Sequence, residues 1–449
     1  MSQVLSRDAR PGYGAHRLMS ATAFSIISTA VLALYPPLSA QAATLVPGNQ
    51  QTTPRAVEES APLSLATALQ LALNASADLS AARQEVSAVD ASVIQAGIRP
   101  NPAVSASIED LRKQTRTSTL QLNQLLELGG KRTARVTAAE LGREAALADL
   151  AIKRAEIRAN TITSFFDVVI AQERLRLAHS SIELAQRATT ATAHRVTAGK
   201  VSPVEETKAR VAEANVRLEL NQAKSELVNA RKRLCAIWGN PTPRFEQASA
   251  NLAELPALPA SADLPARLTS SPVLVRARIE VDHRLALVDV EKSRRTPNVT
   301  VSVGVKHAEE LGRNQALLGI SVPLPLFDRN QGNLLEALRR ADKAEDQLSV
   351  VESRLDSDVA QAYTHLANAR QEVESLQQDI LPGAQSAYDA AAKGFEFGKF
   401  GFLDVLDAQR TLLQAKTQYL RGLSDTHRAA AELDRLLSDG SSVAKFVKP

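Results

Sequence analysis

Two acidic residues three positions apart, Asp404 and Asp407, have the spacing in this sequence that best suits chemistry. They follow Gly398 and Gly401 in the segment KGFEFGKFGFLDVLDAQ, residues 393–409. On an α-helix a spacing of three puts both carboxylates on one face, where they can attract cations. The alternative is structural, because an acidic residue in the first turn of a helix offsets the positive end of the helix dipole.

Other groups that could do chemistry lack the necessary partners. Gly129-Gly130-Lys131 lacks the upstream glycine and the following Ser or Thr of a phosphate-binding loop. No methionine follows residue 42, which removes a thioether relay for Cu(I). Six histidines form no i,i+3 or i,i+4 pair and have no cysteine partner, so surface helix positions explain them better than a zinc site: His179, His194, His283, His307, His365 and His427. We therefore expect no enzyme, no catalytic residue, no cofactor and no metal site.

The segment around the acidic pair has a counterpart 199 residues upstream. There the sequence is AGKVSPVEETKAR, residues 198–210, whose Gly199-Lys200 matches Gly398-Lys399. The chain is therefore two copies of one unit, each with a helix–break–helix elbow. In the first copy Ser202-Pro203-Val204-Glu205 has the pattern of a capping box, so we assign Glu205 to structure.

Each copy contains a pair of alternating segments followed by long helices. The segments alternate aliphatic residues with Ser, Thr, Gln or Lys at period two, as strands do. Outside these alternating segments, apolar residues recur at steps of three and four residues, which indicates helices and a coiled-coil seam. Abundant alanine, 44% apolar and only 4% aromatic residues also suit long, closely packed helices.

The sequence predicts a mainly α protein with a small β part. Its expected divisions are, in chain order: signal peptide 1–42; flexible leader 43–62; first repeat 63–240 with strands at about 103–112 and 117–126 and an elbow at 198–205; Pro-rich connector 241–272; second repeat 273–437 with strands at about 298–307 and 314–324 and an elbow at 394–404; loose tail 438–449.

The N-terminus indicates export from the cytoplasm. Arg7, Arg10 and Arg17 precede an apolar run, and Ala40-Gln41-Ala42 offers a small-x-small cleavage site, which together are typical of a secretory signal peptide. Removing residues 1–42 lowers the formal net charge from +4 to +2. The chain has no basic run, so we expect no nucleic-acid partner.

The strands favour a shared membrane barrel. Strands of about ten residues with one aliphatic face suit a tilted span of a bilayer. Four strands cannot close alone, because small barrels need about eight, and open edges in lipid leave backbone groups unpaired. Several chains must then share one barrel. The alternative is a pair of soluble β-ribbons at the end of coiled coils.

The layout resembles the outer-membrane efflux protein family (TolC-like) over essentially the whole mature chain. The elbow FGKFGFLDVLDAQRTL carries the resemblance, and LELGGKRTAR (126–135) and ISVPLPLFDRNQG (320–332) are similar to the cobalt–zinc–cadmium, heavy-metal branch. The resemblance implies a homotrimer in the bacterial outer membrane, with a 12-stranded barrel in outer-membrane lipid and a 12-helix tunnel through the periplasm. It also implies two partners, a periplasmic adaptor (membrane fusion protein) and an inner-membrane RND-type proton antiporter.

The resemblance also implies roles for residues at the tip. Asp404 and Asp407 match the acidic pair of the family's periplasmic constriction, and in a trimer they would form two rings of carboxylates. Phe395 and Phe400 stand where the family has a Tyr and an Arg, so a hydrophobic constriction could replace the polar lock. Exposed tip residues that would contact the adaptor are Gly199, Lys200, Gly398 and Lys399.

The expected function is a passive exit duct with a periplasmic gate, exporting cobalt, zinc or cadmium. Two alternatives stay open: an outer-membrane duct for drugs or other small molecules, and a secreted coiled-coil scaffold or adaptor that conducts nothing. The sequence does not identify the exported substrate, because pump specificity lies in the partners.

Overall fold

The computed structural model describes residues 58, 60–252, 254–397 and 399–437. They belong to one compact unit, residues 53–449. The expected signal peptide, nearly all of the expected leader, the expected tail and Gly398 lie outside the described residues.

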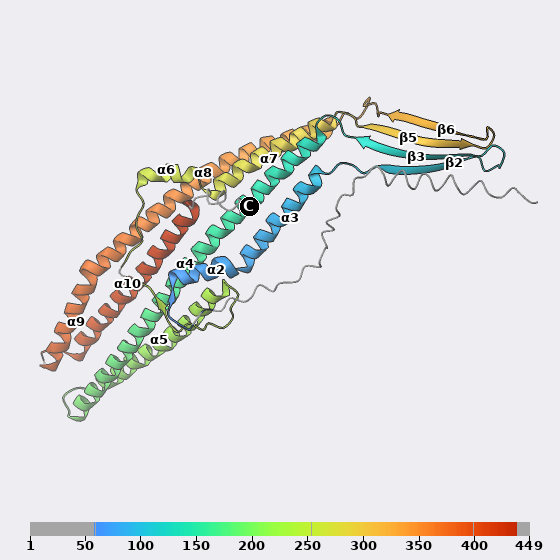
Figure 1. The fold of residues 1–449 in the computed structure, drawn as a ribbon. Coiled ribbons are helices and arrows are strands. Elements are labelled where there is room, and N and C mark those ends of the chain that lie inside the picture. The colour runs from blue at the N-terminus through green and yellow to red at the C-terminus, as the bar shows by residue number, and fades with distance from the viewer. Residues whose placement is uncertain (1–57, 59, 253, 398, 438–449) are drawn as a thin grey trace, which may run out of the picture. The chain divides into compact units, whose positions relative to one another are not determined.

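The described chain consists of long helices and two small sheets (Figure 1). The strands are β1 (Leu63–Ser64), β2 (Ala103–Glu109), β3 (Thr117–Leu126), β4 (Ala248–Ser249), β5 (Val299–Ala308) and β6 (Arg313–Ser321). The helices are α2 (Leu65–Ala75), α3 (Ala77–Gly97), α4 (Lys131–Thr197), α5 (Pro203–Ala236), α6 (Leu264–Thr269), α7 (Pro272–Arg294), α8 (Gln331–Ser375), α9 (Leu381–Glu396) and α10 (Phe402–Leu437). The sequence-based prediction of a mainly α fold with a small β part is confirmed.

The larger sheet joins the two repeats. Its strand order is β2-β3-β5-β6, all antiparallel, and β3 pairs with β5 from Thr117↔Ala308 to Leu126↔Val299. The register lines up one aliphatic side chain from every strand, Val104↔Leu122↔Val303↔Leu318, and all four are exposed. On the opposite face Asn123 bonds Ser105 and Ser302. Each strand therefore has one aliphatic and one polar face, and within the described residues β2 and β6 each have one free edge.

Helix α4 is the element against which most others pack. It contacts α2, α3, α5, α7 and α10, and its 67 residues correspond to a length of about 100 Å. Its buried side chains are largely alanines in the half nearer the sheet, which lets neighbouring helices approach closely, and larger residues such as Phe165 and Val168 further along. None of the described helices combines the length and the apolar character that crossing a lipid bilayer requires.

Two of the expected continuous helices are interrupted. The apolar spacing of residues 63–98 predicts a single helix, but the helix breaks at Ser76, which is extended and lets α2 and α3 bury Ala72 and Leu79 separately. The second long helix has a π-helical turn at Leu376–Ile380. Pro382 lacks an N–H and its ring crowds the carbonyl four residues before it, so the wider turn accommodates it. The three- and four-residue apolar spacing of this helix predicts Ile380 on its buried seam, but the extra residue of the π-helical turn shifts the helical phase and Ile380 is 46% exposed.

The described residues of the expected leader and connector make specific contacts. Glu58, within the expected leader, is buried, and its carboxylate accepts hydrogen bonds from Trp238 Nε1 (3.1 Å), Asn240 Nδ2 (2.9 Å) and the Arg244 N–H (2.7 Å). Burial acts to raise the pKa of Glu58, but these bonds hold it below its usual range. The expected connector contains β4, which pairs with β1, and buries Phe245. Long-range contacts that the local composition did not indicate therefore hold Glu58 and the described part of the connector.

Candidate functional site

The two elbows close their helices in the same way. At the end of α4, Gly199 has φ +67° and donates its N–H to Val196 O, while Lys200 donates to Arg195 O, both at 2.9 Å. This is the Schellman arrangement, which satisfies carbonyls at the end of a helix. At the end of α9, the Lys399 N–H donates to Gly394 O at 2.8 Å, the equivalent bond. Both lysines are exposed beyond the helix ends.

A contact between the elbows fastens one repeat to the other. The guanidinium carbon of Arg195 lies 3.8 Å from the centroid of the Phe395 ring, and its Nη2 donates a hydrogen bond to Phe395 O at 3.1 Å. Phe395, expected in an apolar constriction, is therefore partly covered by a cation from the first repeat. No local sequence pattern indicates this role for Arg195, because an arginine in the last turn of a helix ordinarily serves the helix end. One sequence signal was available: the position equivalent to Arg195 in the second repeat is Gly394, so the two elbows differ at this position.

Gly394 leaves space for the ring of Phe400, the second phenylalanine of this elbow. A Cβ added at Gly394 would overlap Cδ2 of Phe400, so the ring packs where any other residue would carry a side chain. Phe400 is still 49% exposed. The two phenylalanines thus differ: Phe395 is held by Arg195, while Phe400, between α9 and α10, rests on Gly394 with about half its surface open.

A cleft of about 310 Å³ lies between the elbows. One carboxylate from each repeat, Glu205 and Asp404, lines it together with Arg195 and Phe395. Asp404 Oδ2 accepts the Gly401 N–H at 2.8 Å, so it also satisfies a backbone donor at the start of α10. Asp407 is exposed but does not line this cleft.

The structure also qualifies the structural role expected for Glu205. Ser202 Oγ accepts the Val204 N–H at 3.3 Å and so caps the helix, but the Glu205 N–H donates to the Ser202 carbonyl, so the reciprocal bonds of the expected capping box are not seen. The Glu205 carboxylate lies 3.5 Å from Lys208 Nζ and lines the cleft. Glu205 therefore belongs to the site as well as to the helix start.

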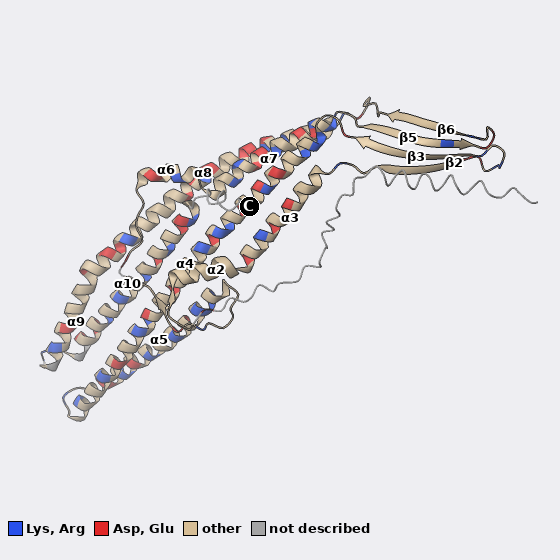
Figure 2. Ribbon diagram, in the orientation of Figure 1, with Lys and Arg blue, Asp and Glu red and all other residues tan. Residues whose placement is uncertain are grey.

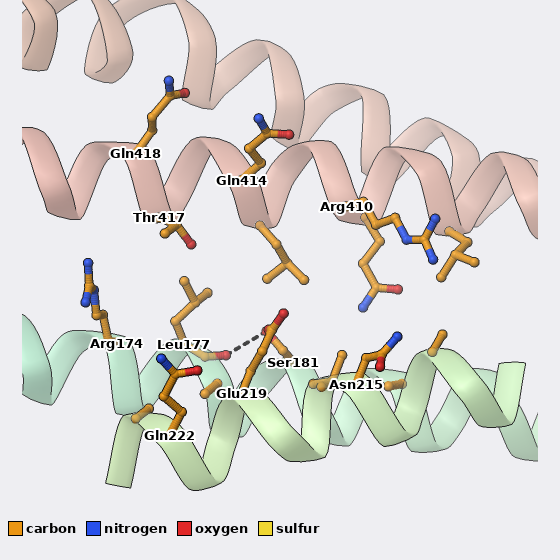
Figure 3. Close-up of a pocket in the computed structure, with 18 of the residues that line it drawn as sticks. Arg174, Leu177, Ser181, Asn215, Glu219, Gln222, Arg410, Gln414, Thr417 and Gln418 are labelled. Carbon is orange, nitrogen blue, oxygen red and sulfur yellow. Dashed lines mark hydrogen bonds between the residues drawn. The ribbon is translucent and has the colours of Figure 1, made fainter. Parts of the chain in front are cut away.

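A larger cleft of about 610 Å³ lies above the elbows, between the α4–α5 hairpin and α10 (Figure 3). In Figure 3, Thr417 on α10 and Asn215, Glu219 and Gln222 on α5 point into the gap, whereas Gln414 points away. Small residues of α4 and α5 also line it: Ala178, Ala185, Ala188, Ala209, Ala212 and Ala223. A polar groove with so many small residues suits water or a helix of another protein better than an apolar ligand.

The histidines differ from expectation at one position. His427, expected on a helix surface, is buried on α10 and stacks on Phe166 of α4, with ring centroids 3.4 Å apart. Its Nε2 has no hydrogen-bond partner within the described residues. Burial lowers the pKa of His427 to about 4. Across residues 58–437, where described, no three His, Cys, Asp or Glu residues lie close enough to hold a metal ion.

Sequence comparison identifies relatives over most of the chain. Residues 68–240 and 264–439 match the outer membrane efflux protein family. The cobalt-zinc-cadmium resistance protein CzcC of Cupriavidus metallidurans is 49% identical over 85% of this chain and 91% of that protein. The nickel-cobalt-cadmium resistance protein NccC of Alcaligenes xylosoxydans xylosoxydans is 27% identical over 67% of this chain and 69% of its own length.

Comparison of structures identifies membrane proteins with the same fold. The Campylobacter jejuni CmeC outer membrane channel matches with a TM-score of 0.72 at 17% identity, over 85% of this chain and 88% of that one. A membrane protein from Pseudomonas aeruginosa matches with a TM-score of 0.74 at 19% identity, over 86% and 91% of the two chains. With two family repeats in sequence and the channel fold in structure, this chain belongs to the outer membrane efflux protein family and is a non-enzymatic outer-membrane efflux channel component with a helical periplasmic extension.

Proposed function

We propose that this chain is the exit duct of a tripartite efflux system that exports cobalt, zinc and cadmium cations. The observation that carries the choice of cargo is the 49% identity, over 91% of its length, to a protein named for resistance to these metals. Duct and pump divide the work: the inner-membrane proton antiporter supplies the energy, and this chain supplies a water-filled path and a gate.

The proposed assembly is a homotrimer. Within the described residues β2 and β6 have free edges, and the aliphatic face of the sheet is exposed. Unpaired backbone groups in lipid cost several kcal/mol each, which favours closing the edges against other copies. Three sheets of four strands give a barrel of 12, which is wide enough for an aqueous lumen.

The proposed gate is the pair of elbows. Asp404 and Asp407 supply exposed carboxylates, and Phe395 and Phe400 supply rings at the end of α9. The Arg195–Phe395 contact supports a closed state, because separating the repeats at the tip breaks a cation–π contact and a hydrogen bond together. Opening then requires the partner proteins to replace that contact.

The adaptor is proposed to bind at the same end of the helices. Gly199, Lys200 and Lys399 lie at the exposed tips, and Gly398 takes its place among them by sequence. The small residues of the cleft above the elbows would let helices of the adaptor lie close to α4 and α5. The contact surface would then run from the tips along the groove.

Metal export by a reconstituted system tests the proposal. A bacterial strain lacking its own metal-efflux duct, but keeping the adaptor and pump, should regain growth in cobalt, zinc and cadmium when it makes this chain. Restored tolerance to organic drugs without restored metal tolerance would instead support a duct for small molecules. If the chain leaves the outer-membrane fraction on carbonate washing, it is a secreted scaffold and the duct is wrong.

A further inference from the structure

An open groove of about 610 Å³ lies where α7 and α8 meet the sheet. Two arginines line it, Arg295 after the end of α7 and Arg329 just before α8. The rest of the lining is mostly apolar: Leu326, Phe327, Leu334, Leu335 and Leu338, with Gln331. Phe327 is 91% exposed and Leu326 is 65% exposed. Two cations thus stand beside a large apolar surface.

These two arginines differ from the other basic residues nearby. Figure 2 shows acidic and basic residues crowded at this end of α7 and α8. Arg294 pairs with Glu291 at 2.6 Å, and Arg339 pairs with Asp342 at 2.9 Å. In the described part of the chain, no carboxylate lies within ion-pairing distance of the Arg295 or Arg329 side chain. Their charges are therefore available to a ligand.

The loop that carries Arg329 is held in place. Asn330 adopts φ +57° and donates from Nδ2 to the Glu291 carbonyl (2.9 Å) and carboxylate (2.7 Å) on α7. The neighbouring acid, Asp328, accepts the Asn330 N–H at 2.9 Å. Gln331 Oε1 accepts the Arg329 N–H at 2.9 Å. Local bonds thus fix the backbone of Arg329 next to the end of α7.

The groove continues the apolar face of the sheet. Leu318 and Ile320 on β6 are followed at the same period of two by Val322, Leu324 and Leu326, and all are exposed. The helices of this family extend into the periplasm, so this end of the sheet lies at the periplasmic side of the outer membrane. A small soluble anion would use the arginines but leave the leucines and Phe327 in water. An anionic amphiphile would use both.

We propose that Arg295 and Arg329 bind the phosphate of an anionic phospholipid in the periplasm-facing leaflet, with the first acyl carbons over Leu326, Phe327 and Leu335. Guanidinium groups bind phosphate oxygens through paired, charge-assisted hydrogen bonds. Basic pockets beside membrane-embedded surfaces select anionic head groups in the same way. The proposal rests on the proposed placement of the aliphatic sheet face in lipid.

Native mass spectrometry of the full-length assembly in detergent tests this site, with phosphatidylglycerol or phosphatidylcholine of equal chain length as the probe. The wild-type protein should retain phosphatidylglycerol preferentially. Arg295→Gln with Arg329→Gln should weaken phosphatidylglycerol binding about 25-fold, at about fivefold for each charge lost. The matched control, Arg294→Gln with Arg339→Gln, removes two ion-paired arginines from the same helices and should change binding less than about twofold.

Three outcomes would overturn the inference. Equal phosphatidylglycerol binding by the double variant and the wild type would mean that the arginines do not hold the head group. Full displacement of the lipid by inorganic phosphate would mean that the apolar floor contributes nothing. Loss of lipid only together with dissociation of the assembly would mean that a second copy of the chain covers the groove. Failure of the proposed duct is distinguishable, since a wild-type chain that stays monomeric would show it.

Discussion

The carboxylate of Asp404 accepts the Gly401 N–H at the start of α10, so its charge and its capping bond can be removed separately. Asparagine keeps an oxygen that can accept this bond, whereas alanine loses it at a cost of about 1 kcal/mol. Since rings of carboxylates attract cations, the wild-type channel should favour cations and be partly blocked by divalent cations in planar bilayers. Asp404→Asn with Asp407→Asn should abolish that block and weaken the cation selectivity without lowering the unfolding temperature. An unchanged divalent block in this variant would mean that the two residues serve only the helix start.

Arg195 is the residue at the tip whose loss should loosen the gate most directly. Arg195→Gln removes the cation over Phe395 and the bond to its carbonyl. A cation–π contact is worth about 0.5–2 kcal/mol, so single-channel recordings should show open time rising about 2- to 30-fold. Arg210→Gln, which breaks an ion pair within α5 near the same elbow, is the control. Equal conductance of both variants would place the closing contact elsewhere.

Among the elements, α4 and α10 meet at a histidine that folding keeps neutral. The charged groups beside it on these helices, Asp167, Asp425 and Arg428, pair with one another. Because burial lowers the pKa of His427 to about 4, the unfolded chain binds this proton more readily as the pH falls below about 6.5. The contribution of neutral His427 to the free energy of unfolding is therefore fully present above about pH 6.5 and is lost as the pH falls toward 4.

Substitution of this histidine tests the coupling between pH and packing. His427→Phe keeps an aromatic ring on Phe166 but cannot bind a proton, so the wild type should lose about 2 kcal/mol relative to the variant between pH 7 and pH 5. Thermal unfolding of both proteins across that range measures the difference. Parallel pH profiles would contradict a role for His427.

Glu58 and the end of α5 are joined through the only tryptophan of the chain, Trp238. Glu58→Ala leaves the buried indole N–H without its acceptor and should cost about 1–3 kcal/mol. It should also let water reach Trp238, so the emission of this single tryptophan should shift to the red. Glu206→Ala in the first turn of α5, at the opposite end of that helix from Trp238, should leave the emission unchanged. If Glu58→Ala also leaves the emission of Trp238 unchanged, the environment of Trp238 does not depend on Glu58.

At the scale of the whole molecule, the two faces of the sheet should respond differently to charge. Leu318→Arg on the aliphatic face of β6 should disfavour insertion by about 2–4 kcal/mol per chain, since that face is proposed to contact lipid. Gln315→Arg on the opposite face of the same strand should be tolerated. Native mass spectrometry should show three chains for the wild type and for Gln315→Arg, and a reduced trimer fraction for Leu318→Arg. Equal assembly of both variants would contradict the proposed barrel.

How much the sequence could predict depends on the range of the interaction. Alternation at period two located the strands, and Gly199-Lys200 with Gly398-Lys399 located the elbows, because these signals lie within a few neighbouring residues. Arg195 and Phe395 are 200 residues apart, and Glu58 is 180 residues from Trp238, so no local pattern could reveal either contact. The break at Ser76 carried no glycine or proline, and packing of α2 and α3 on α4 determines it.

The contact at the tip exists only because the two repeats are unlike. A chain with two copies of the first elbow would have Arg195 twice and Val196 in place of Phe395. A chain with two copies of the second elbow would have Gly394 in place of the arginine and no cation to offer. Each half is therefore a specific ligand for the other, as two different subunits are in a heterodimer. Recombination that made the halves identical would erase the contact, so a duplicated gene of this kind can keep it only by preserving the difference between its halves.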